Sequence, residues 1–215
     1  MIYLTFARLR KKGIKFLVPL IVLFVVLPVM GLIFRRHYAD SPEQFLRVIV
    51  TQLHVWVPVF SSWWSLVLFH DFFESEGNEL LYLYHKPVFF LQVQYLAILL
   101  YAVGIFLFFL VFQIIAPIDS FALPQLIAES FAISSLTYFL CFLLLNTGAA
   151  FLVPVAYSIY INLFDSLNLL SFLSIFPDNS SVTSENVKRI VHCCAAAVIF
   201  SFGGFVCSKY RRKYK

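Results

Sequence analysis

Charged residues are scarce in this chain. Only 13% of its 215 residues are Asp, Glu, Lys or Arg, while 61% are hydrophobic and the mean hydropathy is +0.89. A soluble domain carries about 25% charged residues, because its surface faces water. The low charge therefore excludes a soluble enzyme, a conventional nucleic-acid-binding domain and a disordered tail, and it indicates a chain solvated mainly by lipid.

Cysteine and glycine are also few, and their spacing matches neither a disulfide framework nor a phosphate-binding loop. The four cysteines lie in apolar stretches rather than in a secreted disulfide framework, so we interpret them as small core residues. None of the seven glycines builds the phosphate-binding loop G-x-x-x-x-G-K-[ST], so we expect no cofactor bound by this chain. His192, Cys193 and Cys194 are adjacent and diverge by about 100° on a helix, so no metal site is expected. Without a Ser/His/Asp grouping at matching membrane depths, no catalytic residue is expected either.

Long apolar runs are abundant instead, and they predict six membrane spans. A helix needs about 20 apolar residues to cross the hydrocarbon core of a bilayer. The run over 130–177 holds one charge, Asp165, and is long enough for two helices divided at the turn-like Asn146-Thr147-Gly148. We therefore predict an all-α integral membrane protein, a single transmembrane domain over 1–215. Its spans are expected at about 16–34, 48–69, 90–115, 127–146, 149–171 and 190–208.

The positions of the basic residues predict the orientation. Cytoplasmic loops of membrane proteins are enriched in Lys and Arg. Five bases precede the first span and five follow the last, and Lys86 lies in the loop after the second span. The bases left for the outer side are Arg35, Arg36, Arg47, Lys188 and Arg189. We therefore expect both termini in the cytoplasm, with the first span retained as a signal anchor in the plasma membrane.

The segment 71–87, between the second and third spans, differs from the rest of the chain. It holds four of the eleven acidic residues, Asp71, Glu74, Glu76 and Glu79. Acidic side chains are repelled by an anionic inner leaflet, so we expect them to face a protein partner or water. They are followed by an apolar run, 80–84, that is too short to cross the membrane, and then by Pro87. This pattern predicts a short interfacial helix; the alternative is a solvated loop without a partner.

Here the chain resembles the ABC-2 family of transporter permeases, the membrane subunits of ATP-driven exporters. That family has six spans, both termini inside, and an acidic Gly-x-x-Glu-Leu-Leu…Pro stretch that forms a coupling helix on the ATPase. The residues that carry the resemblance are Glu76, Gly77, Glu79, Leu80, Leu81 and Pro87. By this resemblance, the ATPase-coupling residues are Glu74, Glu76, Gly77, Glu79, Leu80, Leu81 and Tyr82.

The resemblance also implies the partners. Two copies of a separate ABC ATPase would bind ATP and Mg, and a second permease subunit would complete a homodimer or heterodimer. The exported substrate would be hydrophobic or amphipathic: a peptide, a lipid or a drug. An alternative from another class is a non-transporting membrane scaffold or assembly factor that docks a cytoplasmic partner through 71–87. A membrane-embedded enzyme is a third hypothesis, without support from any polar catalytic cluster.

Polar and aromatic residues inside the spans are the remaining candidates. His54 and Trp56 are possible substrate-pathway residues, and the alternative for His54 is a hydrogen-bonded position in the core. For Trp63 and Trp64 we favour interfacial anchoring. Asp165 and Glu129 fall near the outer ends of their predicted spans, so we interpret both as interfacial.

Small residues recur every four positions in the last span, at Cys193, Ala197 and Ser201. Small side chains at this spacing let two membrane helices approach closely. We therefore predict a helix-packing face, and the sequence leaves open whether it contacts the same subunit or a second one.

Overall fold

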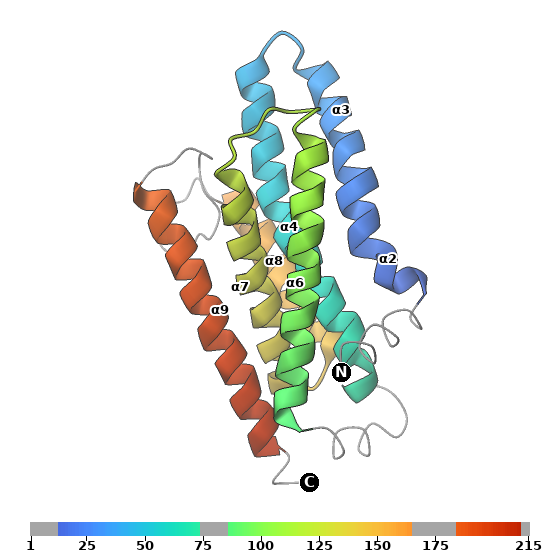
Figure 1. The fold of residues 1–215 in the computed structure, drawn as a ribbon, viewed down its shortest axis with the longest axis vertical. Coiled ribbons are helices and arrows are strands. Elements are labelled where there is room, and N and C mark those ends of the chain that lie inside the picture. The colour runs from blue at the N-terminus through green and yellow to red at the C-terminus, as the bar shows by residue number, and fades with distance from the viewer. Residues whose placement is uncertain (1–12, 74–85, 165–183, 212–215) are drawn as a thin grey trace.

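The computed structural model describes residues 13–73, 86–164 and 184–211, and these are helical without any strand. The first helical rod consists of α2 (Ile14–Ile21), the π-helical turn η1 (Val22–Val26) and α3 (Leu27–His37). It is followed by α4 (Pro42–Phe73), α6 (Pro87–Phe112), α7 (Ala122–Leu144), α8 (Thr147–Phe164) and α9 (Ser184–Arg211). Figure 1 shows these helices as an elongated bundle.

Five helices in the described residues are long and apolar enough to cross a membrane, which supports the predicted multi-pass class. They are Ile14–His37, Pro42–Phe73, Pro87–Phe112, Ala122–Leu144 and Asn186–Tyr210. The predicted span 149–171 corresponds to α8, whose apolar stretch Thr147–Tyr160 is shorter. Residues 165–183, with Asp165, and 74–85, with most of the predicted coupling segment, lie outside the described residues. The orientation of the termini stays a prediction.

Several helices extend beyond the charge-free runs from which the spans were predicted. The second span was predicted from residue 48 and the fourth from 127, whereas α4 begins at Pro42 and α7 at Ala122. A run of apolar residues marks the part of a helix that faces hydrocarbon, but backbone hydrogen bonding continues into the headgroup region. Pro42 suits the first turn of α4, where its missing N–H costs nothing.

Two tryptophans of α4 hold the first rod in place. Pro19 has no N–H, so it cannot donate to the carbonyl of Lys15 four residues earlier. Trp63 Nε1 donates to that Lys15 carbonyl at 2.8 Å. Trp64 Nε1 donates to the Phe16 carbonyl at 2.8 Å, and its ring stacks on Phe16 with 5.1 Å between centroids. Trp64 is buried, so the interpretation of this residue as an interfacial anchor was wrong: its indole joins two helices.

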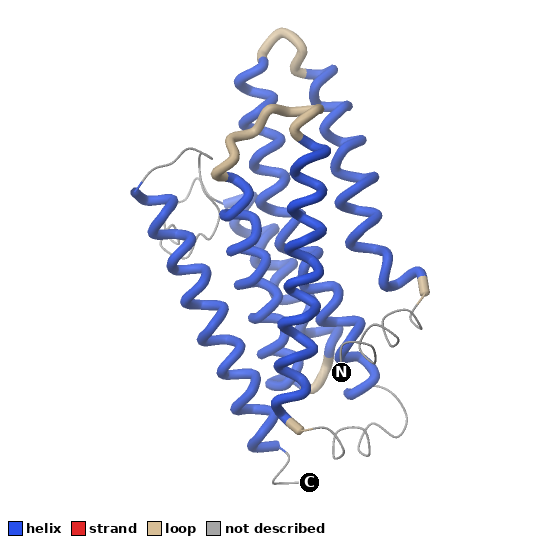
Figure 2. The backbone as a smooth tube through the Cα atoms, in the orientation of Figure 1, coloured by secondary structure: helices blue, strands red, loops and turns tan. Residues whose placement is uncertain are grey.

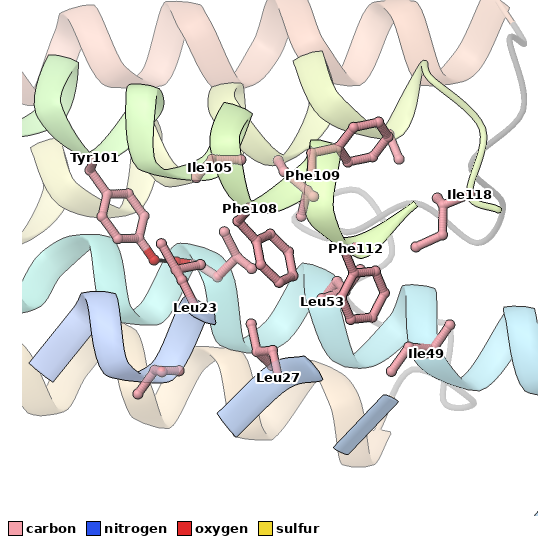
Figure 3. Packing of buried hydrophobic residues seen from close by; sticks show 14 of the residues in the cluster. Leu23, Leu27, Ile49, Leu53, Tyr101, Ile105, Phe108, Phe109, Phe112 and Ile118 are labelled. Carbon is pink, nitrogen blue, oxygen red and sulfur yellow. Dashed lines mark hydrogen bonds between the residues drawn. The ribbon is translucent and has the colours of Figure 1, made fainter. Parts of the chain in front are cut away.

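The helices surround α4 and α7. The helix α7 makes its most extensive contacts with α9 and α4, and α8 packs on both α4 and α7. Figure 2 shows that the described backbone is helical apart from short connecting loops. The largest hydrophobic cluster lies between the first rod, α4 and α6. Figure 3 shows its interdigitating side chains. They include Leu23, Leu27, Ile49, Leu53, Ile105, Phe108 and Phe112. Tight packing of this kind replaces the hydrophobic driving force that lipid cannot supply between helices.

Small side chains line the contact between α7 and α9. Cys193 and Ala197 of α9 form one buried cluster with Ala128 and Ala132 of α7. One turn further along, the Ser201 hydroxyl donates to Ser135 Oγ at 3.2 Å. The predicted small-residue face of the last span therefore lies against α7 of the same subunit.

Gly204 continues this contact, and it provides a stability test. A Cβ added at Gly204 would collide with the Tyr138 ring, whereas one at Gly104 would meet only ordinary contacts at 3.6 Å or more. We expect Gly204→Ala to lower the free energy of unfolding by about 1–3 kcal/mol relative to Gly104→Ala. Both variants gain the same helix propensity, so their difference isolates the collision. Equal stability in an SDS-unfolding titration would contradict the close approach of α9 to Tyr138.

Candidate functional site

Buried polar side chains gather where α4, α6 and α7 face one another. Their spacing follows the helical repeat: His54, Ser61 and Ser65 share one face of α4, and Ser130 and Ser134 lie one turn apart on α7. Inside a lipid-solvated bundle such groups are costly unless they are paired, and they commonly mark functional positions. The buried polar residues of the three helices are His54, Ser61, Ser62, Ser65, Gln94, Gln125, Glu129, Ser130, Ser134, Ser135 and Thr137.

The centre of this region is a pair formed by His54 of α4 and Glu129 of α7. His54 Nδ1 lies 2.7 Å from Glu129 Oε2, and the two residues are only 1% and 2% exposed. The expected interfacial position of Glu129 was therefore wrong. Its side chain faces α4 inside the bundle, seven residues, or about 10 Å along the helix, after the start of α7 at Ala122. For His54, the structure supports the hydrogen-bonded core position among the two alternatives.

Towards the other end of α7, a hydrogen-bonded network joins all three helices. Ser65 Oγ donates to Gln94 Oε1 at 2.8 Å, and Gln94 Nε2 donates to the Ser134 carbonyl at 3.0 Å and to its hydroxyl at 2.8 Å. Ser61 Oγ lies 2.9 Å from the Ser130 carbonyl and donates to it. Each buried polar atom in this network has a partner, so the network stabilises one relative position of α4, α6 and α7.

Around the His54–Glu129 pair, by contrast, several buried atoms have no hydrogen-bond partner among the described residues. They are His54 Nε2, both amide atoms of Gln125 and the Ser130 hydroxyl. Unsatisfied buried polar groups are rare in native proteins and each calls for an explanation. The polar region therefore has two parts: a satisfied network at Ser65, Gln94 and Ser134, and an unsatisfied one at the pair.

The two residues proposed for a substrate pathway do not come together. Trp56 is 40% exposed on the outside of the bundle, where its Nε1 donates to Gln52 Oε1 at 2.9 Å. His54 points to the interior, because residues two apart on a helix diverge by about 200°. Any ligand that contacts both would have to surround α4. Their common role as one substrate-facing wall has no geometric support.

The structure offers no metal centre within the residues it describes. No three His, Cys, Asp or Glu side chains cluster there. All four cysteines are free thiols, with Cys141 and Cys193 buried. In the polar region, the His54 ring and the Glu129 carboxyl are groups that can form hydrogen bonds and exchange a proton.

An aromatic cluster closes the end of the bundle from which the predicted coupling segment emerges. Phe69 and Phe72 of α4 pack with Phe90 of α6 and with Tyr138 and Phe142 of α7. The ring centroids of Phe72 and Phe90 are 5.0 Å apart, and those of Phe90 and Phe142 are 5.3 Å apart. Ala150 of α8 and Cys207 of α9 contact the same cluster. The proposed coupling residues themselves, at 74–82, lie outside the described residues.

Comparison with known proteins finds no match. The chain matches no protein-family model, no curated protein and no solved structure.

One feature of the sequence indicates the His54–Glu129 pair, although the charge-free runs used to predict the spans do not reveal it. Gln125 and Glu129 lie four residues apart on α7, and so do Ser130 and Ser134. Polar side chains at this spacing form a stripe along a helix, which in an apolar segment indicates an interior face. The stripe predicts that Glu129 faces a partner helix, but it does not identify His54 as the partner.

Proposed function

We propose that this chain is the membrane permease subunit of an ATP-driven exporter. In this proposal, two copies of a separate ATPase bind ATP and Mg, and their closure moves the cytoplasmic segment around 74–84. The chain itself supplies the pathway for a hydrophobic or amphipathic substrate. A second permease subunit, identical or similar, completes the transporter. The proposal comes from the acidic Glu76-to-Pro87 stretch and its resemblance to the ABC-2 permeases.

The observation that supports the proposal is the packing of the two helices that flank this segment, α4 and α6. The helices on either side of it end in the aromatic cluster: Phe72 lies next to Phe89 at 6.4 Å and next to Phe90 at 5.0 Å between ring centroids. Close-packed side chains transmit displacement rather than absorb it. A force applied between Phe73 and Pro87 would therefore reach α4, α6 and α7 together.

The charge of the segment fits a protein partner better than a lipid surface. Glu74, Glu76 and Glu79 lie within six positions, with Lys86 as the one base before Pro87. Carboxylates at the cytoplasmic surface are repelled by anionic lipid but can pair with Lys or Arg on a docking protein. A groove with basic residues on the ATPase is the expected complement.

The test is reconstitution with an ATPase. The tagged chain is co-expressed with the Walker-motif ATPase encoded nearest to its gene, purified in mild detergent and placed in lipid vesicles. We expect the two to co-elute and the ATPase activity to rise several-fold when the chain is present. An ATPase with its phosphate-loop lysine replaced by alanine is the control for contaminating hydrolysis.

Two outcomes separate the alternatives. Failure of the chain to associate with any candidate ATPase overturns the proposal and favours a scaffold that docks another partner through 71–87. Association without stimulation of hydrolysis also counts against a permease role, because a coupled transporter must change the ATPase rate.

A further inference from the structure

The unsatisfied part of the polar region contains one basic atom, His54 Nε2. The other ring nitrogen, Nδ1, is occupied by Glu129 Oε2 at 2.7 Å. In a neutral imidazole one nitrogen is a donor and the other an acceptor. If the Nδ1 hydrogen is donated to the Glu129 carboxylate, Nε2 carries a free lone pair. That atom is buried and has no partner among the described residues.

We propose that His54 and Glu129 form an intramembrane proton-binding site. A proton from hydronium binds at His54 Nε2 and leaves a water molecule behind; the Glu129 carboxylate is the counter-ion of the resulting imidazolium. Without this proton the pair carries one negative charge, and with it the pair is neutral. Because a low-dielectric interior disfavours net charge, the neutral, protonated pair is the stable form there. This site is independent of whether the chain works with an ATPase.

Other groups facing the pair modulate its charge. From α9, the cation of Arg189 attracts the Glu129 carboxylate, and the thiol of Cys193 is close to it. Among the described residues, α6, α8 and the Ile14–His37 rod add no further charge that acts on Glu129. Arg189 offsets part of the negative charge and so opposes proton binding at His54. It is only half-buried, so water screens it, whereas Glu129 contacts the ring directly.

Gln125 lies between the pair and the nearer end of α7. It is three residues from Ala122, about 5 Å along the helix, and Glu129 is about 10 Å from the same point. Both amide atoms of Gln125 are buried without a partner. An amide can both donate and accept a hydrogen bond, so Gln125 can bind a water molecule on its way to the pair. This arrangement makes the Ala122 end the expected side of proton entry.

The experiment is a titration of the full chain labelled with ¹⁵N-histidine, in vesicles of phosphatidylcholine. Solid-state NMR reports the protonation of both ring nitrogens for each of the five histidines. Spectra are recorded from about pH 5 to pH 10, a range that covers perturbed histidines. His54→Asn assigns the His54 signal. If that variant does not fold, single Asn variants of the other four histidines assign their signals and leave the His54 signal by elimination; those residues are His37, His70, His85 and His192. Glu43→Gln is the exposed control on the same helix as His54.

We expect both ring nitrogens of His54 to carry a proton at the acid end of the series in the wild type, as an imidazolium paired with Glu129. Glu129→Gln retains a hydrogen-bond acceptor but removes the counter-ion, and should weaken proton binding at least tenfold, a shift of one pH unit or more to lower pH. Arg189→Gln should shift the titration the other way. A His54 ring that holds a single proton at every pH tested, or a protonation unmoved by Glu129→Gln, would overturn the proposal.

Discussion

Replacement of Glu129 by leucine should be among the most destabilising single substitutions in this protein. It leaves the buried His54 ring with neither nitrogen satisfied. Removing one partner of a buried charged pair costs about 3–5 kcal/mol, because the other remains desolvated without compensation. We expect a loss of this size in the free energy of unfolding. It can be measured by SDS titration in mixed micelles with far-UV circular dichroism as the signal.

The double variant His54→Leu/Glu129→Leu is the informative comparison. Replacing both partners of a buried pair by apolar residues is often neutral or stabilising, so most of the loss should be recovered. Glu43→Leu, at an exposed position in the first turn of α4, should change stability by less than about 0.5 kcal/mol. If Glu129→Leu lowers the free energy of unfolding no more than Glu43→Leu does, the His54–Glu129 pair does not stabilise the packing of α4 on α7.

The second large effect concerns the proposed coupling segment. Reversing both charges in Glu76→Lys/Glu79→Lys changes the segment by four units of charge. If these carboxylates pair with bases on the ATPase, the reversal places like charges opposite each other, which costs several kcal/mol at an interface. We expect loss of the chain's stimulation of ATP hydrolysis and of export, measured in vesicles with the reconstituted complex.

A matched control lies at the opposite end of the bundle. Asp40 and Glu43 are exposed between α3 and the first turn of α4, the loop at the top of Figure 1. Asp40→Lys/Glu43→Lys makes the same change in charge and should leave stimulation intact. Unchanged transport in Glu76→Lys/Glu79→Lys would remove the coupling assignment while leaving the membrane fold and the proton-binding proposal untouched.

The two predicted effects, on stability and on coupling, concern two different regions of the same helix bundle. The aromatic cluster around Phe72 and Phe142 closes one end, and the His54–Glu129 pair lies towards the other. Between them the satisfied network at Ser65, Gln94 and Ser134 joins α4, α6 and α7. A structure built this way can transmit a displacement along α4 and α7, with the unsatisfied pair as the position where protonation changes the charge inside the bundle.

The sequence predicted the class of this protein and the approximate places of its helices. Runs of about 20 apolar residues have one stable form in lipid, a helix with its backbone hydrogen bonds satisfied internally. Helix ends were predicted less well, at Pro42 and Ala122 for example, because a backbone helix does not stop where charge first appears. The turn at Asn146 was predicted correctly: α7 ends at Leu144 and α8 begins at Thr147.

The site was predicted only in parts. Cys193, Ala197 and Ser201 could be grouped because their spacing lies within a single helix. Trp64 and Glu129 were assigned to the interface because hydropathy places residues along a span but does not say which way a side chain faces. Their partners, Phe16 and His54, belong to other helices.

The low charge content alone therefore determined that lipid is the solvent of this protein and that helices are its form. Only the tertiary structure decided that Glu129, expected at a membrane surface, is buried against a histidine 75 residues away in the chain. The physical reason is that apolar content is a local property, whereas the pairing of two polar groups depends on how α4 packs on α7. Helix packing in lipid follows from small side chains and hydrogen bonds across many residues.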